Sequence, residues 1–151
     1  MRMTLFSDYS LRVLLYLTVR DDRLNSIKEI AEAYKISKNH LMKVVQELSR
    51  LGLVDTVRGR DGGIKLAKPA NQINVGFVVR RTEPDFELVE CFNKRDNTCC
   101  IEPACALKPA LAEAQAAFLK TLDKYSLADM LPQKHKLLTL LTTSAKGSVE
   151  K

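Results

Sequence analysis

The chain contains 151 residues, of which 46% are hydrophobic and 6% aromatic, and its formal net charge is +6. This length suits one domain, or one small domain with an appended element, and the composition suits a helical protein with an aliphatic core. No apolar run approaches the ~18 residues that a membrane span needs, and the N-terminus has polar groups where a signal peptide would be apolar. We therefore expect a cytoplasmic protein that does not enter a membrane.

Positive charge is concentrated in the N-terminal part of the chain. Residues 1–67 contain 12 Lys/Arg against 8 Asp/Glu, and within them residues 35–67 contain 7 against 3. A local basic excess is a possible footprint for a polyanion. A solvated, lysine-rich surface without a ligand would show the same excess, so charge alone leaves both interpretations open.

Residues 4–20 have apolar side chains at helical spacing, which predicts a first helix that ends at a pair of aspartates. Ser26 and Glu29 then form the pattern of a capping box, in which each side chain bonds the backbone N–H of the other residue. The pattern predicts a short second helix from Ser26 to about Tyr34.

A tight turn at residues 35–36 separates this helix from a third. Ser37 is the predicted N-cap, and a buried apolar stripe runs from Leu41 to Leu51. Gly52 follows as a natural residue for the C-terminal end of a helix. Two helices joined by a turn of a few residues form a helix-turn-helix.

Two short strands are expected next, at residues 53–58 and 64–67. The segment 59–63 between them contains three glycines, which permit the positive φ angles of a hairpin turn. A phosphate-binding glycine loop is not favoured, because the strand–loop–helix context is missing. A helix-turn-helix followed by a hairpin is a winged helix, and we predict this mainly α architecture for residues 1–67.

The remaining chain is expected to connect and pair subunits. Residues 68–90 form a connecting segment in which Asn74 caps a short helix. A long helix is expected at about 108–125, because apolar residues recur there every three or four positions as in a coiled-coil seam. A helix packed on its own core would show the same stripe. We assign residues 106–131 to a dimerisation helix with a short cap, and 132–151 to a partly disordered C-terminal tail.

The second helix of a helix-turn-helix enters the major groove and presents its N-terminal residues to base edges. Asparagine pairs with adenine and lysine donates to guanine, while serine at a helix N-terminus suits a phosphate. Arginines on the hairpin suit phosphates or the adjacent minor groove of double-stranded DNA. Each side chain also has a plain solvated alternative. The candidate DNA-binding residues are Ser37, Lys38, Asn39, His40, Lys43, Arg58 and Arg60.

All four cysteines, Cys91, Cys99, Cys100 and Cys105, fall within 15 residues of one polar loop, at 91–105. Thiols stay reduced in the cytosol, so structural disulfides are disfavoured and a metal or redox use is favoured. Thiolates crowd together when one object such as a soft metal centre holds them, because like charges otherwise repel.

Three site chemistries compete for these thiols. A zinc site usually shows closely spaced cysteine pairs, and the adjacent Cys99 and Cys100 are poorly placed to share one small ion. A thiol redox switch needs two cysteines, and the chain has no Cys-x-x-Cys. An iron–sulfur cluster accepts loop-borne ligands at uneven spacing and is favoured, with Cys105 just before a helix N-terminus that stabilises a thiolate.

Five stretches between the N-terminus and about residue 130 carry a specific resemblance. They are Phe6–Arg12 (FSDYSLR), Ile36–Lys43 (ISKNHLMK), Val57–Ile64 (VRGRDGGI), Cys99–Cys105 (CCIEPAC) and Leu122–Asp129 (LDKYSLAD). Taken together, the chain resembles the iron–sulfur winged-helix transcriptional repressors, the family that includes IscR, and most closely its nitric-oxide sensors.

The resemblance implies a homodimer in which three cysteines of each subunit hold an iron–sulfur cluster. Cys91, Cys99 and Cys105 match these ligands, whereas Cys100 falls where the family tolerates an ordinary residue. A 4Fe–4S cluster is preferred, although a 2Fe–2S cluster would satisfy the same ligands.

The nitric-oxide sensors are further thought to take a carboxylate from the other subunit as the fourth ligand. Asp8 of the partner subunit is the matching position. Arg12 lies one helical turn from Asp8 and is placed to orient its carboxylate. Without the resemblance, the same two residues would be interpreted as a surface ion pair worth ~0.5 kcal/mol or less.

The resemblance implies transcriptional repression that nitric oxide relieves. The cluster would hold both recognition helices at the spacing of a palindromic operator, and its nitrosylation would release them. The alternative is an IscR-like regulator that reports iron–sulfur cluster status. An enzyme is not expected, because a thiol nucleophile needs a nearby base and the two histidines, His40 and His135, lie far from the cysteines in the sequence.

Overall fold

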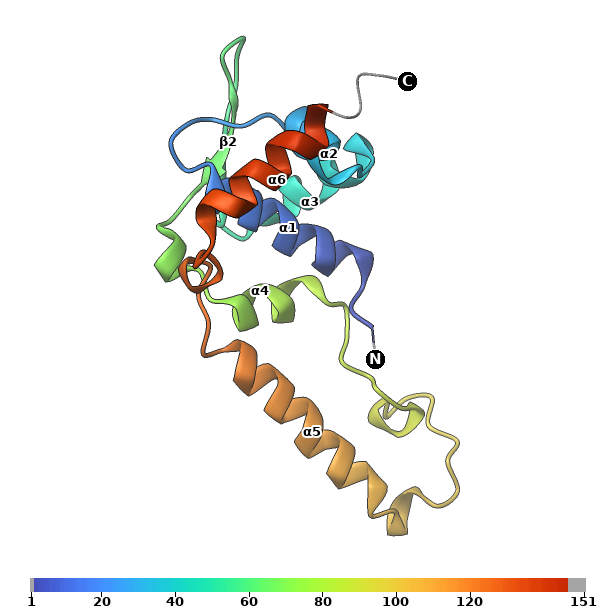
Figure 1. Ribbon diagram of the computed structural model, residues 1–151. Coiled ribbons are helices and arrows are strands. Elements are labelled where there is room, and N and C mark those ends of the chain that lie inside the picture. The colour runs from blue at the N-terminus through green and yellow to red at the C-terminus, as the bar shows by residue number, and fades with distance from the viewer. Residues whose placement is uncertain (1, 147–151) are drawn as a thin grey trace.

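The computed structural model describes residues 2–146, in which the chain forms six α-helices, one antiparallel hairpin and four 3-10 turns (Figure 1). The helices are α1 (Leu5–Val19), α2 (Ile27–Tyr34), α3 (Lys38–Arg50), α4 (Val75–Thr82), α5 (Leu107–Leu122) and α6 (Lys134–Lys146), and the strands are β1 (Val54–Val57) and β2 (Gly63–Leu66). In Figure 1, α5 extends away from the other helices, which gather around α1. This is the mainly α winged-helix fold that the sequence predicts.

The helix-turn-helix consists of α2 and α3. The capping box forms as predicted, with the Glu29 N–H donating to Ser26 Oγ at 3.1 Å and the Ser26 N–H donating to Glu29 Oε2 at 2.7 Å. Lys35 ends α2 with a positive φ of 54°, and its N–H bonds the last carbonyls of that helix. Ser37 occupies the N-cap position of α3, but its side chain makes no capping hydrogen bond within the described residues. Ser37 is therefore the N-cap residue, as predicted, but its hydroxyl does not bond the helix.

A single aliphatic core holds the recognition helix α3 in place. The buried side of α3 packs against α1, α2 and the hairpin, and each buried aliphatic side chain contributes about 1.5–3 kcal/mol of transfer free energy. Leu127, from beyond α5, enters the same core at 2% exposure. The fully buried core residues include Val13, Leu14, Leu17, Ile30, Leu41, Val44, Leu48, Leu53, Ile64 and Ile73.

The hairpin pairs β1 with β2 in a register that runs from Val54 opposite Leu66 to Val57 opposite Gly63. The turn needs glycine twice. Gly59 has a φ of 116°, and a Cβ on Gly62 would lie 2.3 Å from the Val57 carbonyl oxygen. Asn25, from the loop after α1, bonds Ile64 through both backbone groups and so fixes the base of the hairpin to the core.

The C-terminal segment differs from the prediction of a partly disordered tail at 132–151. Residues 134–146 form α6, which lies along α1 and α2 (Figure 1). Leu137, Leu138 and Leu141 are half-buried, Leu141 packs against the core, and Lys134 pairs with Asp21 at 2.8 Å. The leucines recur at helical spacing, so the segment forms a helix that packs on the core although much of its composition is polar. The rest of the predicted tail, 147–151, lies outside the described residues.

The long helix α5 differs from α1, α2, α3 and α4, each of which has buried residues. None of its 16 residues is buried against the rest of residues 2–146, although the helix is rich in leucine and alanine. Leu107 is 62% exposed. No helix within the described residues is both long enough and apolar enough to pass through a membrane.

Replacing Ser26 by alanine removes the hydrogen bond that its hydroxyl accepts from the Glu29 N–H at the start of α2. We expect the free energy of unfolding, measured by urea denaturation, to fall by about 1 kcal/mol. Ser37→Ala is the matched control, because Ser37 also occupies an N-cap position but its side chain makes no capping bond. In this variant we expect the free energy of unfolding to fall by much less. Equal losses in the two variants would contradict the structural difference between these caps.

Tyr34 ends α2 and packs edge-to-face against Tyr16 of α1, with ring centroids 6.2 Å apart. Burial raises the pKa of Tyr34 to about 12, against about 10 in an unfolded chain. Because the pKa of Tyr34 is higher in the folded state, burial of the protonated hydroxyl stabilises the folded state. This contribution is complete below about pH 10 and is lost as the pH rises toward about 12.

In Tyr34→Phe the ring remains but nothing titrates. We therefore expect the free energy of unfolding to decrease less steeply over this alkaline range in the variant than in the wild type. Urea denaturation at several pH values from about 9 to about 11 checks this. If the free energy of unfolding changed with pH by the same amount in both proteins, burial would not raise the pKa of Tyr34.

Candidate DNA-binding surface and thiol loop

The residues predicted to read DNA lie on one exposed face. Ser37, Lys38, Asn39, His40 and Lys43 are all exposed at the start of α3. Their helix is fixed from behind by its buried stripe, so these side chains are presented on a rigid support. Because Ser37 does not cap the helix, its hydroxyl and the N–H groups of the first turn are available to a phosphate.

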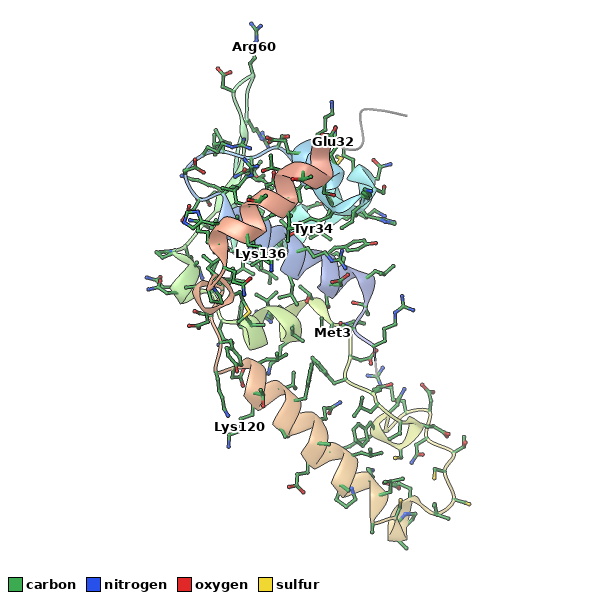
Figure 2. The ribbon with its side chains drawn as sticks, viewed as in Figure 1. Met3, Glu32, Tyr34, Arg60, Lys120 and Lys136 are labelled. Atoms are coloured by element: carbon green, nitrogen blue, oxygen red, sulfur yellow. The ribbon has the colours of Figure 1, made fainter. Side chains whose placement is uncertain are left out.

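The hairpin carries the second group of predicted DNA contacts. Arg58 and Arg60 are exposed, and Figure 2 shows Arg60 at the tip, pointing away from the helices. Neither guanidinium forms an ion pair with an acidic residue in the described part of the chain. An unpaired arginine on a projecting hairpin suits a backbone phosphate or the minor groove.

One side of His40 is occupied by the protein itself. Its ring lies 6.3 Å, centroid to centroid, from the ring of Tyr9 on α1, with the ring planes tilted by 36°. A contact of His40 with another part of the protein was not predicted from the sequence. Tyr9 was missed because it touches a residue 31 positions later, and no local spacing indicates such a contact.

Asp8 and Arg12 form the pair that their spacing predicts. Arg12 Nε donates to Asp8 Oδ1 at 3.0 Å and Nη2 approaches Oδ2 at 2.9 Å, so both carboxylate oxygens are engaged. The side chains are 44% and 37% exposed for Arg12 and Asp8. The guanidinium carbon of Arg12 also lies 5.8 Å from the ring centroid of Tyr34, at the turn of the helix-turn-helix. Arg12 thus contacts both Asp8 and the DNA-binding unit.

The four cysteines lie in the irregular segment between α4 and α5. Cys91 is in a 3-10 turn, Glu90–Phe92, and Cys105 precedes α5 by two residues. All four thiols are outside disulfides, and Cys91, Cys99 and Cys105 are half-buried while Cys100 is exposed. Exposure therefore separates Cys100 from the three predicted ligands.

Side-chain bonds shape the loop around these thiols. Glu90 accepts hydrogen bonds from the backbone N–H and hydroxyl of Thr98, which hold the pKa of Glu90 below its usual value. Asn97 accepts from the Cys99 N–H at 3.1 Å, and the Cys99 carbonyl in turn accepts from the Glu102 N–H at 3.2 Å. The loop is thus folded by its own polar residues.

A positive charge lies close to two of the thiols. Lys108, in the first turn of α5, forms an ion pair with Glu102. The pair raises the pKa of Lys108, and the neighbouring Cys91 and Cys105 add to the shift. Lys108 was not among the predicted site residues, and its position three residues after Cys105 was the available signal.

The loop suits an iron–sulfur centre by the chemistry of its donors: three half-buried thiols outside disulfides, with a lysine beside two of them. The single chain does not gather them into a complete site. Within residues 2–146, His, Cys, Asp and Glu side chains form no group of three close enough to hold a metal ion. Asp8 in particular bonds Arg12 and is not grouped with the thiols in the described residues.

Comparison with known proteins gives consistent results. Residues 3–133 match the Rrf2 family, described as iron-dependent transcriptional regulators. The chain is 51% identical to the HTH-type transcriptional regulator NsrR of Halalkalibacterium halodurans and 52% identical to that of Bacillus subtilis, in each case over 142 residues that cover 93% of this chain and 97% of the relative.

Solved structures agree with the sequence relatives. T. potens IscR has a TM-score of 0.70 at 25% identity, covering 87% of this chain and 86% of that one. CymR, the global cysteine regulator of B. subtilis, has a TM-score of 0.70 at 26% identity, covering 86% and 95%. The relatives are named as transcriptional regulators rather than enzymes, as the sequence analysis expects. The chain therefore belongs to the Rrf2 family of DNA-binding transcriptional regulators.

Proposed function

We propose that this regulator is a cytoplasmic, homodimeric repressor that senses nitric oxide through an iron–sulfur cluster. Cys91, Cys99 and Cys105 of one subunit and Asp8 of the partner subunit would hold the cluster, and a 4Fe–4S centre is preferred over 2Fe–2S. When bound, the cluster supplies an iron centre that reacts with nitric oxide. The target is a palindromic operator in double-stranded DNA.

The observation that carries the proposal is the separation of two incomplete donor groups in one chain. Three half-exposed thiols lie in the segment between α4 and α5, and a half-exposed carboxylate, Asp8, lies on α1. Within the described residues these side chains do not form a group close enough to hold a metal ion. Donors that do not meet within a subunit can meet between two subunits related by symmetry. The iron-dependent description of the matched family agrees with a metal at this place.

The exposure of α5 supports the dimer. A helix with leucine, alanine and phenylalanine along one side, and with none of its 16 residues buried in the described chain, leaves apolar surface in water. Its seam of alternating three- and four-residue spacing fits an antiparallel or parallel partner helix of the same kind. A second copy of the chain would cover this seam and bring each α1 near the other subunit's thiols.

Arg12 and Tyr9 connect Asp8 to the DNA-reading helix. The guanidinium of Arg12 contacts the Asp8 carboxylate on one side and the Tyr34 ring on the other. Tyr9, next to Asp8 in sequence, packs on His40 at the start of α3. A change in the engagement of Asp8 therefore alters contacts at the turn and at the first residues of the recognition helix. In a dimer, such changes alter how well both helices fit one operator.

The second candidate is an IscR-like regulator that reports cluster supply. It is favoured by the structural likeness to T. potens IscR. The two candidates share the thiol ligands and differ in the signal: cluster loss for the second, and nitric oxide acting on an assembled cluster for the first.

The ligand assignment can be tested with two neighbouring thiols. Cys99→Ser removes a half-buried candidate ligand, whereas Cys100→Ser removes an exposed thiol one residue away. After anaerobic purification, we expect iron, sulfide and visible absorption to be lost in Cys99→Ser and to match wild type in Cys100→Ser. Loss of the cluster in Cys100→Ser with retention in Cys99→Ser would reverse the assignment. A wild-type protein without iron and sulfide would refute the cluster itself.

The signal can be tested on operator binding. A DNA duplex selected from random sequences by anaerobic wild-type protein serves as the probe, and fluorescence anisotropy gives its affinity. We expect nitric oxide to weaken binding by at least about tenfold, which corresponds to about 1.4 kcal/mol of bias toward the DNA-competent state.

Two controls separate the candidates. Cluster-free protein prepared by chelation shows what loss of the cluster alone does to the affinity. If chelation weakens binding but nitric oxide does not, the IscR-like candidate replaces the nitric-oxide sensor. If neither treatment changes the affinity, both candidates fail.

A further inference from the structure

The connection between α5 and the winged helix is made by three polar side chains. Asn74 and Arg80 lie at the two ends of α4, and Asp123 follows the last residue of α5. We call this group the α4–α5 joint. In Figure 1, α5 approaches the other helices at this end, while its other end carries the thiol loop away from them.

Arg80 and Asp123 form a bidentate ion pair, in which two guanidinium nitrogens bond the two carboxylate oxygens. Arg80 Nη2 donates to Asp123 Oδ2 at 2.7 Å, and Nη1 donates to Oδ1. The pair lowers the pKa of Asp123 and raises that of Arg80. Two parallel bonds between planar groups restrict rotation as well as distance. This pair therefore fixes the orientation of the end of α5 against α4.

Asn74 bonds both helices at once. Its Oδ1 accepts from the Phe77 N–H at 2.9 Å and so caps α4. Its Nδ2 donates to the carbonyls of Asp123 and Tyr125, at 2.7 Å and 3.2 Å. One amide thus starts α4 and satisfies the carbonyls that follow the end of α5.

The backbones approach closely at the same place. The Val75 N–H donates to the Tyr125 carbonyl at 2.9 Å, and the Leu127 N–H donates to the Ile73 carbonyl at 3.0 Å. A Cβ on Gly76 would lie 2.1 Å from Asp123 Oδ1 and 2.9 Å from the Asp123 nitrogen. Only glycine permits this approach, and the buried Leu127 anchors it to the core. Farther along α5, Gln115 donates to the Phe86 carbonyl and adds one more support.

The direction of α5 has consequences at a distance. Sixteen residues of helix span about 24 Å at 1.5 Å per residue. A rotation of about 10° at one end therefore displaces the other by about 4 Å. In a dimer joined along α5, such a rotation changes the separation of the two recognition helices, which DNA requires to match a whole number of helical turns.

We propose that the α4–α5 joint positions α5 and thereby determines which half-site spacing the dimer reads. The inference rests on the proposed α5-mediated dimer. Asn74, Arg80 and Asp123 are positioning residues in this view, since none of them lies on the exposed face of α3 or on the hairpin. The pair is on the surface, where ion pairs contribute little to stability, so its removal should change geometry more than folding.

The test uses palindromic duplexes whose half-sites are separated by the selected spacer or by spacers one or two base pairs longer and shorter. The half-sites come from DNA selected by anaerobic wild-type protein. The variants are Arg80→Ala and Asp123→Ala. Arg81→Ala is the matched control, because the neighbouring guanidinium lies 5.7 Å from the Phe77 ring instead of bonding Asp123.

We expect wild type and Arg81→Ala to lose about tenfold or more in affinity when the spacer changes. Arg80→Ala and Asp123→Ala should bind the selected spacer more weakly, and their preference between spacers should shrink to roughly threefold or less. Thermal unfolding and dimer mass, measured in parallel, should stay close to wild type. The double variant with Arg80→Asp and Asp123→Arg restores the opposite charges and should regain much of the preference.

A spacing profile of Arg80→Ala identical to that of wild type would overturn the inference and leave the proposed function intact. A second outcome would also overturn the inference and leave the proposed function intact. In that outcome, the spacing profile of Arg80→Ala changes only together with a loss of folding, and the double variant restores stability but not the spacing preference. A wild-type protein that binds as a monomer, or without any spacing preference, would refute the proposed dimer and this inference with it.

Discussion

The burial of one side of α3 is the constraint on which the DNA-binding surface depends. Leu41, Val44, Val45 and Leu48 are buried against α1, α2 and the hairpin. Because interiors are close-packed, a helix fixed in this way cannot rotate without opening the core. The exposed residues from Ser37 to Lys43 therefore keep one orientation relative to α1, and anything that moves α1 or the turn before α3 is felt by the whole surface.

This arrangement explains why the contacts of α1 matter for the proposed switch. Arg12 reaches the turn at Tyr34, and Tyr9 reaches His40, both within one helical turn of Asp8. The thiol loop, by contrast, lies between α4 and the start of α5. Two routes would therefore link the loop to the DNA: a short one through Asp8 of the partner subunit, and a long one along α5 to the joint at Arg80 and Asp123.

Local patterns in the sequence predicted local structure well. The capping box at Ser26, the positive φ at Gly52 and the hairpin glycines follow from rules that span a few residues. The pairing of Asp8 with Arg12 was also accessible, because residues four apart on a helix are neighbours. The family match shows that the five resembling stretches were interpreted correctly at that level.

Features that depend on distant residues were not predictable. The contact of Tyr9 with His40 and the bonding of Asp123 to Arg80 join residues 31 and 43 positions apart. Ser37 matched the composition of a cap, yet the side chain does not bond the helix start. The segment of α6 was assigned to a tail because the surface on which it packs is formed by α1 and α2, at least 100 positions earlier in the sequence. The thiol ligands, the partner's Asp8 and the DNA contacts remain predictions of the sequence and the resemblance.

The position of α6 affects the order in which the protein can be completed. During synthesis the N-terminal helices leave the ribosome first, and domains generally fold as units as they emerge. Here α1 and α2 must wait for the last described helix, whose Leu141 packs against their core and whose Thr142 accepts a hydrogen bond from Arg20. Until α6 has emerged, a nascent chain therefore leaves in water the surface of α1 and α2 that this helix covers in the finished fold.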